Sequence, residues 1–507
     1  MDFLTSFPGK TYTTQRRQDG KKGVSMNKEL KRRDFIQLAA AGSAFCLYRP
    51  RGWSLGQSQM GLPLASPGCR RSKAKVARLY MATPDAVWPK PNLDLKKEIG
   101  FYRDAFAKMK DELAGIEFPV DELVASPEQV VALRGALAEA DGILAVHLNL
   151  GIWDILKEIL AAGKPTMVFA RPYSGHEWVS FGRLRQEPLG ARMDCLLTSD
   201  MRQLAVALRP FRAIHHLREA KIVNLTTADF SGYAGEVKAK FGTEIQPVGL
   251  DRMAALYNSI SDKDARAETD RWTSRASLIV EPPAGDIFKS CKLALALEKL
   301  LDEEDATVMT VDCYGTMWDK TIKLPAYPCL GFARLNNLGF GGICESDLRC
   351  AMTHIIFQGL VGRPGFVSDP TVDSSKGSII LAHCMGTPKM AGPGGPAAPY
   401  KIRTVMERQE GVVPQVEMRV GQKVTQALLA PLDTLRYFTG EIIESPVGLE
   451  ADRGCRTKVD VRVDGDIAKL WQNWTAGLHR QTVYGDITQE LSYFCRFKDI
   501  TMINEAS

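Results

Sequence analysis

Residues 142–170 read GILAVHLNLGIWDILKEILAAGKPTMVFA and decide the fold class of the region around them. They comprise an apolar run, Gly142–His147, an amphipathic segment, Trp153–Leu160, and a second apolar run, Pro165–Ala170. Two short apolar runs on either side of a helical segment are typical of parallel strands joined by a helical crossover, in a sheet covered on both faces. The stretch therefore predicts an α/β fold with a parallel sheet.

The same alternation extends in both directions along the chain. A strand at Val76–Met81 and a helix within Leu93–Leu113 precede the stretch, and a strand at Cys195–Thr198 follows it. We interpret residues 75–215 as an N-terminal, doubly wound, Rossmann-like α/β domain.

A second Rossmann-like α/β domain is expected over residues 216–390. Its clearest strands are Ile222–Leu225 and Val308–Val311. A helix between them is expected to begin with Asp286 as its N-cap. The apolar side chains of this helix share one face, which predicts that they are buried: Ile287, Cys291, Ala294, Leu297 and Leu301.

The last part of the chain, residues 391–507, predicts a mainly β, barrel-like C-terminal domain. Short apolar runs alternate with turns there, and no long helical pattern comes between them. The expected strands are Lys401–Val405, Val416–Val420, Leu435–Glu444 and Thr457–Val463.

The positive net charge of the chain is concentrated near its N-terminus. The chain has 65 Lys/Arg and 59 Asp/Glu, but residues 1–75 hold 15 of the former and only 4 of the latter. The rest of the chain is mildly acidic, which gives no electrostatic basis for binding nucleic acid. Its 11 cysteines are scattered and form no CxxC pair, so we expect neither a disulfide framework nor a structural zinc site.

An export signal is expected at the start of the chain. Lys31-Arg32-Arg33-Asp34-Phe35 precedes an Ala-rich apolar segment, Ile36–Tyr48, which is too short for an ordinary membrane span. Paired arginines in this setting are typical of a twin-arginine signal. We therefore expect residues 1–50 to be the signal and residues 51–74 to be a Gly/Pro/Ser-rich linker.

On this interpretation, the twin-arginine translocase exports the folded protein to the periplasm or another extracytoplasmic location. No membrane segment is then left once the signal is removed. Two alternatives stay open: a basic helical N-terminus that remains attached, and a translation start at Met26 instead of Met1.

Four side chains are candidate ligands of a metal ion: Glu345, Asp369, His383 and His479. The two carboxylates lie next to apolar sequence, where an ionised carboxylate needs a partner. His383 follows an apolar run at the end of an expected strand, and His479 lies near an expected turn. Carboxylates together with imidazole suit Mn²⁺ or another divalent cation. Each residue taken singly is more often structural, and sequence spacing alone does not bring the four together.

Short sequence motifs around these residues resemble motifs of the L-fucose isomerase and L-arabinose isomerase family. The resemblance implies that Glu345, Asp369 and His479 are metal ligands, and that His383 is either a ligand or a neighbour that supports one. It covers roughly residues 280–485 and rests on these phrases: GICESD at 342–347, GRPGFVSD at 362–369, LAHC at 381–384 and, more weakly, WTAGLHRQT at 474–482.

The resemblance implies a metal-dependent isomerase that interconverts an aldose and a ketose through an enediol. It implies Mn²⁺ or another divalent cation, a small L-fucose- or L-arabinose-like sugar, and a homo-oligomer, either a trimer or a hexamer. Glu345 and Asp369 would also transfer the protons. An export signal departs from this mainly cytosolic family, which leaves two alternatives: an exported enzyme that cleaves glycosides or epimerises sugars, and a sugar-binding protein without catalysis.

Three further residues are candidates for contacting the sugar: Arg363, Trp318 and His176. Alternatively, Arg363 only caps a turn before Pro364, and Trp318 and the nearby Tyr314 pack in the core. His176 follows an expected strand, in a loop where the family often completes its site from a neighbouring subunit. The adjacent pair His215 and His216 is expected to be exposed at the end of a helix.

Overall fold

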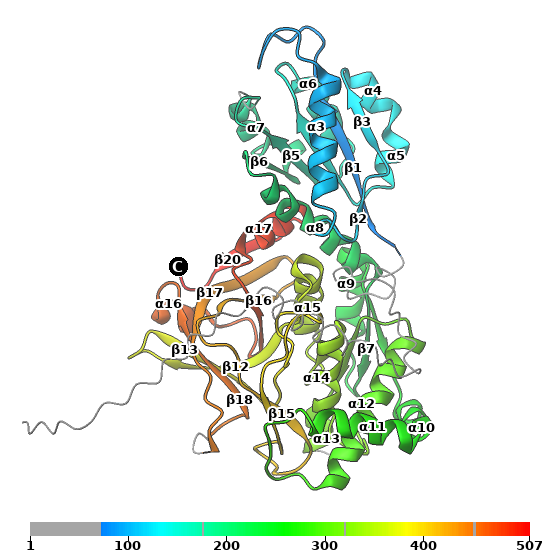
Figure 1. Cartoon of the computed structure of the whole chain (residues 1–507), viewed down its shortest axis with the longest axis vertical. Helices are drawn as coiled ribbons and strands as arrows, with labels where there is room; N and C mark the ends of the chain where they lie inside the picture. Colours follow the sequence, from blue (N-terminus) through cyan, green and yellow to red (C-terminus); the bar gives the residue numbers. More distant parts are fainter. Residues whose placement is uncertain (1–71, 175–176, 319–320, 450–452) are drawn as a thin grey trace, which may run out of the picture. The chain divides into compact units, whose positions relative to one another are not determined.

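The computed structural model describes residues 72–174, 177–318, 321–449 and 453–507 (Figure 1). The signal expected at residues 1–50 and almost all of the linker expected at 51–74 lie outside these ranges. The described residues form a mixed α/β structure with two parallel sheets and one closed antiparallel barrel. None of the helices in these ranges is long and apolar enough to cross a membrane.

The first parallel sheet is buried on both faces. Along its strand β1, Val76 and Tyr80 pack into one hydrophobic cluster, whereas Ala77 and Leu79 pack into another. Successive side chains of a strand point to opposite faces, so this sheet needs helices on both sides. In sheet order the strands are β2 (Ile116–Glu117), β1 (Ala74–Met81), β4 (Gly142–His147), β5 (Thr166–Ala170) and β6 (Met193–Leu197), with β3 (Asp121–Val124) also paired to β1. The helices are α3 (Leu95–Lys108), α4 (Pro127–Ala132), α5 (Arg134–Ala138), α6 (Trp153–Leu160), α7 (Trp178–Leu184) and α8 (Met201–Glu219).

The second parallel sheet has four strands in the order β11 (Gly341–Ile343), β10 (Val308–Val311), β7 (Lys221–Leu225) and β8 (Glu244–Pro247). Its helices are α9 (Ser231–Phe241), α10 (Leu250–Ser259), α11 (Asp262–Thr273), α12 (Ala284–Glu303), α13 (Cys313–Met317), α14 (Cys329–Leu338) and α15 (Leu348–Val361). The five apolar residues expected on the buried face of α12 are all buried, which confirms that prediction. The expected N-cap was wrong, because α12 begins at Ala284 after Pro283 and Asp286 lies in its first turn.

The barrel closes because its first and last strands pair with each other. The order around it is β16 (Lys423–Leu429), β19 (Arg480–Tyr484), β12 (Phe366–Asp373), β13 (Ser378–His383), β18 (Thr457–Val463) and β17 (Thr434–Glu444), and β17 pairs again with β16. A further strand, β20 (Thr501–Asn504), runs parallel to β17. A separate small sheet contains β15 (Val413–Val416), β14 (Tyr400–Arg403) and β9 (Leu278–Ile279).

Two details of the C-terminal region differ from the expectations. The strand expected at Val416–Val420 is displaced, because β15 ends at Val416 and Val420 is exposed. Two helices also interrupt the strands, α16 (Ile467–Asn473) and α17 (Thr488–Phe497). Helix α17 packs against α8 of the first α/β region, where the rings of Phe497 and Phe211 stack with their centroids 5.1 Å apart.

The domain limits expected at residues 215 and 390 stay predictions. Helix α8 runs continuously across the first of these positions. Strands β12 and β13 precede the second position, yet they pair within the barrel. This pairing matters for the candidate site, because it places Asp369 and His383 on barrel strands.

Candidate metal centre

A strained turn between β11 and α15 positions Glu345. Both Glu345 and the next residue, Ser346, have positive φ angles, 61° and 51°, a region that residues other than glycine rarely adopt. Two contacts hold the turn: the Ser346 amide donates to the Val311 carbonyl (3.0 Å), and the Ser346 hydroxyl donates to Asn224 Oδ1 (2.8 Å). A strained backbone of this kind costs about 1–3 kcal/mol per residue and is characteristic of functional sites.

The barrel register brings the other three candidates to one place. Ser368 of β12 is opposite Arg480 of β19, and these strands are antiparallel, so Asp369 lies beside His479, the residue before β19. On its other side β12 pairs with β13, where Asp369 is opposite Ala382 and next to His383. Residues far apart in sequence therefore meet where the end of β13 and the start of β19 flank the middle of β12.

Glu345 faces both histidines. Its Oε1 lies 3.7 Å from His383 Nε2, and its Oε2 lies 3.4 Å from His479 Nε2. The possible ligand atoms of these three residues all lie within 4.8 Å of one another. Both histidines are buried, and Glu345 is partly buried.

Asp369 lies at the edge of this group. Its Oδ1 is 3.3 Å from His479 Nε2, and the side chain is 35% exposed, more than that of Glu345 at 19%. Among the described residues, this Oδ1 atom is a buried acceptor without a hydrogen bond. A buried carboxylate oxygen without a hydrogen bond needs a further partner, such as a cation or a substrate hydroxyl.

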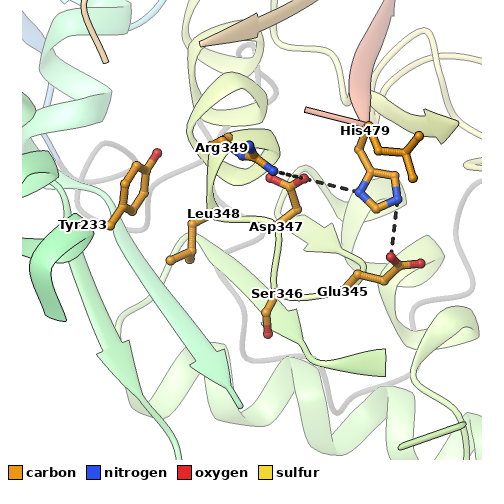
Figure 2. A pocket seen from close by; sticks show the side chains of 8 residues that line it. Tyr233, Glu345, Ser346, Asp347, Leu348, Arg349 and His479 are labelled. Carbon is orange, nitrogen blue, oxygen red and sulfur yellow. Dashed lines mark hydrogen bonds and ion pairs between the residues drawn. The ribbon is translucent and has the colours of Figure 1, made fainter. Parts of the chain in front are cut away.

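Asp347 orients the imidazole of His479 from the side opposite Glu345. Figure 2 shows the imidazole between two carboxylates, with Asp347 on one side and Glu345 on the other. Asp347 Oδ2 lies 3.3 Å from His479 Nδ1, while Oδ1 of the same side chain accepts the Cys350 amide (2.9 Å) and caps α15. We assign the imidazole proton to Nδ1, facing Asp347, which leaves Nε2 free to bind a metal ion.

The pKa values of the two proposed catalytic carboxylates are shifted in opposite directions. Burial opposes the ionisation of Glu345, but its contact with His383 and the charges of both histidines outweigh burial and lower its pKa. For Asp369, burial is the largest effect and raises the pKa; the histidines oppose this effect, and the charges of Glu345 and Glu407 add to it. Burial works against the protonation of His479, but the bond to Asp347 and the charges of Glu345 and Asp369 raise its pKa.

These residues fit a divalent cation. Two imidazole nitrogens and one or two carboxylate oxygens are donors that Mn²⁺ accepts, and other first-row ions accept them too. A carboxylate behind a ligating imidazole, as Asp347 stands behind His479, is the usual support of such a site. The Oδ1 atom of Asp369, which is buried and has no hydrogen bond, is consistent with the same use.

A hollow opens beside the candidate metal centre. It has a volume of about 420 Å³ and is drawn in Figure 2; its lining includes Tyr233, Glu345, Asp347, Arg349 and His479. Its size suits a small polar molecule.

Comparison with known proteins gives one partial match. A stretch of 161 residues is 28% identical to L-arabinose isomerase from Vibrio parahaemolyticus serotype O3:K6 (strain RIMD 2210633). The likeness is partial. It covers 29% of this chain and 30% of the relative, so the chain spans less than a third of the relative's length. No family model matches the chain.

The structure brings Glu345, Asp369, His383 and His479 together, but Arg363, one of the three expected sugar contacts, lies away from them. Arg363 donates to the Tyr484 carbonyl (2.6 Å), at the opposite end of β19 from His479. Trp318 is 45% exposed, and the Arg408 guanidinium lies 4.9 Å from the centre of its ring. His176 lies outside the described residues.

Two residues, Asp347 and Tyr314, have a larger role in the candidate site than the sequence indicates. In the sequence, Asp347 appears only as the last residue of the motif GICESD. Its place just before an apolar helical segment is the one signal that could have identified it. Tyr314, expected to pack in the core, is instead 55% exposed. The charge of Glu345 is the largest cause of the raised pKa of Tyr314, with burial second.

The expectation that His215 and His216 are exposed was wrong. Both are buried in the last turns of α8. His215 lies between two carboxylates, 3.1 Å from Asp141 Oδ2 and 3.5 Å from Glu219 Oε1, so the polar ring has buried partners that a local pattern does not reveal.

Proposed function

We propose that this protein is a metal-dependent sugar isomerase that interconverts an aldose and a ketose through an enediol. One observation carries the proposal: Glu345, His383 and His479 converge on a single point, and Asp369 Oδ1, which has no hydrogen bond, lies beside it, 3.3 Å from His479 Nε2. The partial likeness to an L-arabinose isomerase supports the same chemistry. By that likeness we propose Mn²⁺, or another divalent cation, as the cofactor.

The residues that would hold the cation are Glu345, His383 and His479, with Asp369 as a fourth donor. A divalent cation at this position would polarise two neighbouring sugar oxygens and make the adjacent C–H bond more acidic. His479 would be kept in the ligating tautomer by Asp347.

Asp369 is the better candidate for moving the proton between C2 and C1. It lies at the edge of the ligand group, it is the more exposed of the two carboxylates, and its Oδ1 has no hydrogen bond. Its pKa is raised from the ordinary aspartate value, whereas the pKa of Glu345 is lowered, which favours Asp369 as the group that accepts a proton. Neighbouring carboxylates with opposite shifts commonly divide the roles of an active site in this way. Asp369 would take the proton from C2 and return it to C1, while Glu345 stays ionised.

Tyr314 is placed to contact the sugar. It is exposed, and its hydroxyl lies within the field of Glu345, Asp369 and Glu407. An aromatic ring with a hydroxyl suits a small polyol, because the ring covers C–H groups and the hydroxyl forms a hydrogen bond. The substrate class that we propose is therefore a small, L-fucose- or L-arabinose-like aldose.

The test is the conversion of aldoses to ketoses by protein that has been stripped of metal with a chelator. We expect little conversion in the stripped protein, recovery with Mn²⁺, and no recovery in Glu345→Gln. Conversion that is indifferent to the chelator would contradict the proposal. Metal-independent release of sugars from oligosaccharides would favour the glycoside-cleaving alternative, and sugar binding without turnover would favour a binding protein.

We also propose export by the twin-arginine route and assembly into a homo-oligomer. The first rests on Arg32 and Arg33 before a short apolar segment, and the second on family resemblance alone. Replacing both arginines by lysine should keep the protein in the cytoplasm. Light scattering of the full chain should show a trimer or a hexamer, and a monomer would contradict the second proposal.

A further inference from the structure

A second group of possible ligands lies next to the first and contains two thiols. Cys384 directly follows His383 at the end of β13, and Cys455 lies two residues before β18. These strands pair, with His383 opposite Thr457, so the two cysteines come together at one end of the pair. Glu407, in the segment between β14 and β15, faces both of them.

The spacing of these three side chains fits one metal ion. Glu407 Oε2 lies 3.8 Å from Cys384 Sγ, and Oε1 lies 3.3 Å from Cys455 Sγ. The possible ligand atoms of the three residues all lie within 4.8 Å of one another. In a tetrahedral zinc site, with Zn–S of about 2.3 Å and Zn–O of about 2.0–2.2 Å, neighbouring sulfur and oxygen ligands are about 3.5 Å apart. The observed distances lie on either side of this value.

The nature of the ligands separates this group from the candidate metal centre. Thiolates favour softer ions such as Zn²⁺, whereas the first site offers only imidazole and carboxylate. Three protein ligands also leave a fourth position for water or a small ligand. The nine cysteines in the described residues are free thiols, so neither Cys384 nor Cys455 is committed to a disulfide.

We propose that Cys384, Glu407 and Cys455 form a second metal site, which takes Zn²⁺ or a similarly thiophilic cation. An ion there joins the end of β13 to the start of β18 and to the segment that carries Glu407. Because Cys384 adjoins His383, the ion also fixes one side of the candidate metal centre. The proposal does not depend on the sugar chemistry, since it concerns binding at other side chains. The sequence predicts no structural zinc site because it has no CxxC spacing, whereas the three proposed ligands are 23 and 48 residues apart.

The test uses Co²⁺ as the probe, added to the full chain with its thiols kept reduced. Cobalt bound by thiolates gives a charge-transfer absorption that imidazole and carboxylate do not give, so the two sites are distinguished directly. We expect this absorption in the wild type and in His479→Gln, and its displacement by Zn²⁺. We expect Cys455→Ser and Glu407→Gln to weaken Co²⁺ binding at this site at least about 10-fold.

Cys195→Ser is the matched control, because Cys195 is also partly buried but lies outside the cluster. It should leave the absorption unchanged. Absence of the thiolate absorption in the wild type would overturn the proposal, and so would an undiminished absorption in Cys455→Ser at the same Co²⁺ concentration. A Cys384–Cys455 disulfide formed by mild oxidants, with no metal bound in the reduced protein, would also overturn it. Glu407→Gln keeps the test valid if the cysteine variants fail to fold, because Glu407 is exposed.

Discussion

Oδ2 of Asp347 lies 3.3 Å from Nδ1 of His479, across a separation of 132 residues. This contact links the N-cap of α15 to the residue before β19, and so links the parallel sheet region to the barrel. It also sets the orientation of the imidazole whose other nitrogen faces Glu345 and Asp369. The geometry of the candidate metal centre therefore depends on a residue that is not itself expected to bind the ion.

Asp347→Asn is expected to weaken Mn²⁺ binding about 10- to 100-fold, because a neutral amide no longer fixes the His479 proton at Nδ1. The variant should fold, since Asn caps a helix as well as Asp does. Calorimetric titration with Mn²⁺ measures the effect. Asp466→Asn is the matched control, because Asp466 caps α16 by accepting the Ala468 amide (2.8 Å). Equal Mn²⁺ affinity in wild type and Asp347→Asn would refute the orienting role.

Mn²⁺ binding should weaken as the pH falls, starting above the ordinary histidine pKa of 6.5. The pKa of His479 is raised in the folded protein, and a proton on Nε2 competes with the ion, so affinity falls about tenfold per pH unit below the raised value. In the metal-free protein, the contribution of His479 to the free energy of unfolding changes with pH in the opposite direction. The stabilisation from His479 is complete below the pKa of the unfolded chain and is lost as the pH rises through the folded value. Mn²⁺ titrations and metal-free melting curves across the neutral range check both trends, and a flat affinity down to pH 6 would contradict the first.

Tyr314→Phe is expected to raise KM for the sugar about 2- to 10-fold, which corresponds to the loss of one hydrogen bond. Mn²⁺ affinity should not change, because Tyr314 is not among the possible ligands. Initial rates at saturating Mn²⁺ separate KM from kcat. Tyr257→Phe serves as the control, because Tyr257 lies on α10. A fall in Mn²⁺ affinity in Tyr314→Phe would show that the tyrosine acts on the ion and not on the sugar.

Gly342→Ala is expected to destabilise the fold by about 1–3 kcal/mol, because overpacking forces the backbone to shift. A Cβ atom at Gly342 would lie 2.3 Å from the Cα of Phe332. Gly235→Ala, in the exposed part of α9, has nothing within 4 Å of its added Cβ. That control should instead gain about 0.5–1 kcal/mol. Urea denaturation measures both changes, and a neutral Gly342→Ala would mean that α14 can move away from β11.

Much of the secondary structure could be predicted because its signals are local. Strands β4, β10 and β18 have the bounds that their apolar runs predict. The position of β12 in the barrel could not be predicted, because its pairing with β19 involves residues more than 100 positions apart. The start of α12 was missed because an aspartate in the first turn stabilises a helix in a similar way to an N-cap.

The candidate site was predicted through family resemblance more than through physical reasoning. Residue types and spacing gave Glu345, Asp369, His383 and His479 as candidates, but only the barrel register shows how they meet. Asp347 was missed because its role depends on a contact with a distant residue. Tyr314 was misjudged because an aromatic residue after a strand gives no sign of whether it faces solvent or core.

The most direct test of the central claim is deuterium exchange at C2 of an aldose in D₂O, followed by NMR with Mn²⁺ present. We expect exchange in the wild type, a loss of about 10²- to 10⁴-fold in Asp369→Asn with Mn²⁺ binding weakened less than in Glu345→Gln, and loss of both exchange and binding in Glu345→Gln. Asp373→Asn, further along β12, should behave as the wild type. Exchange that continues undiminished without metal, or in both carboxylate variants, would contradict the account.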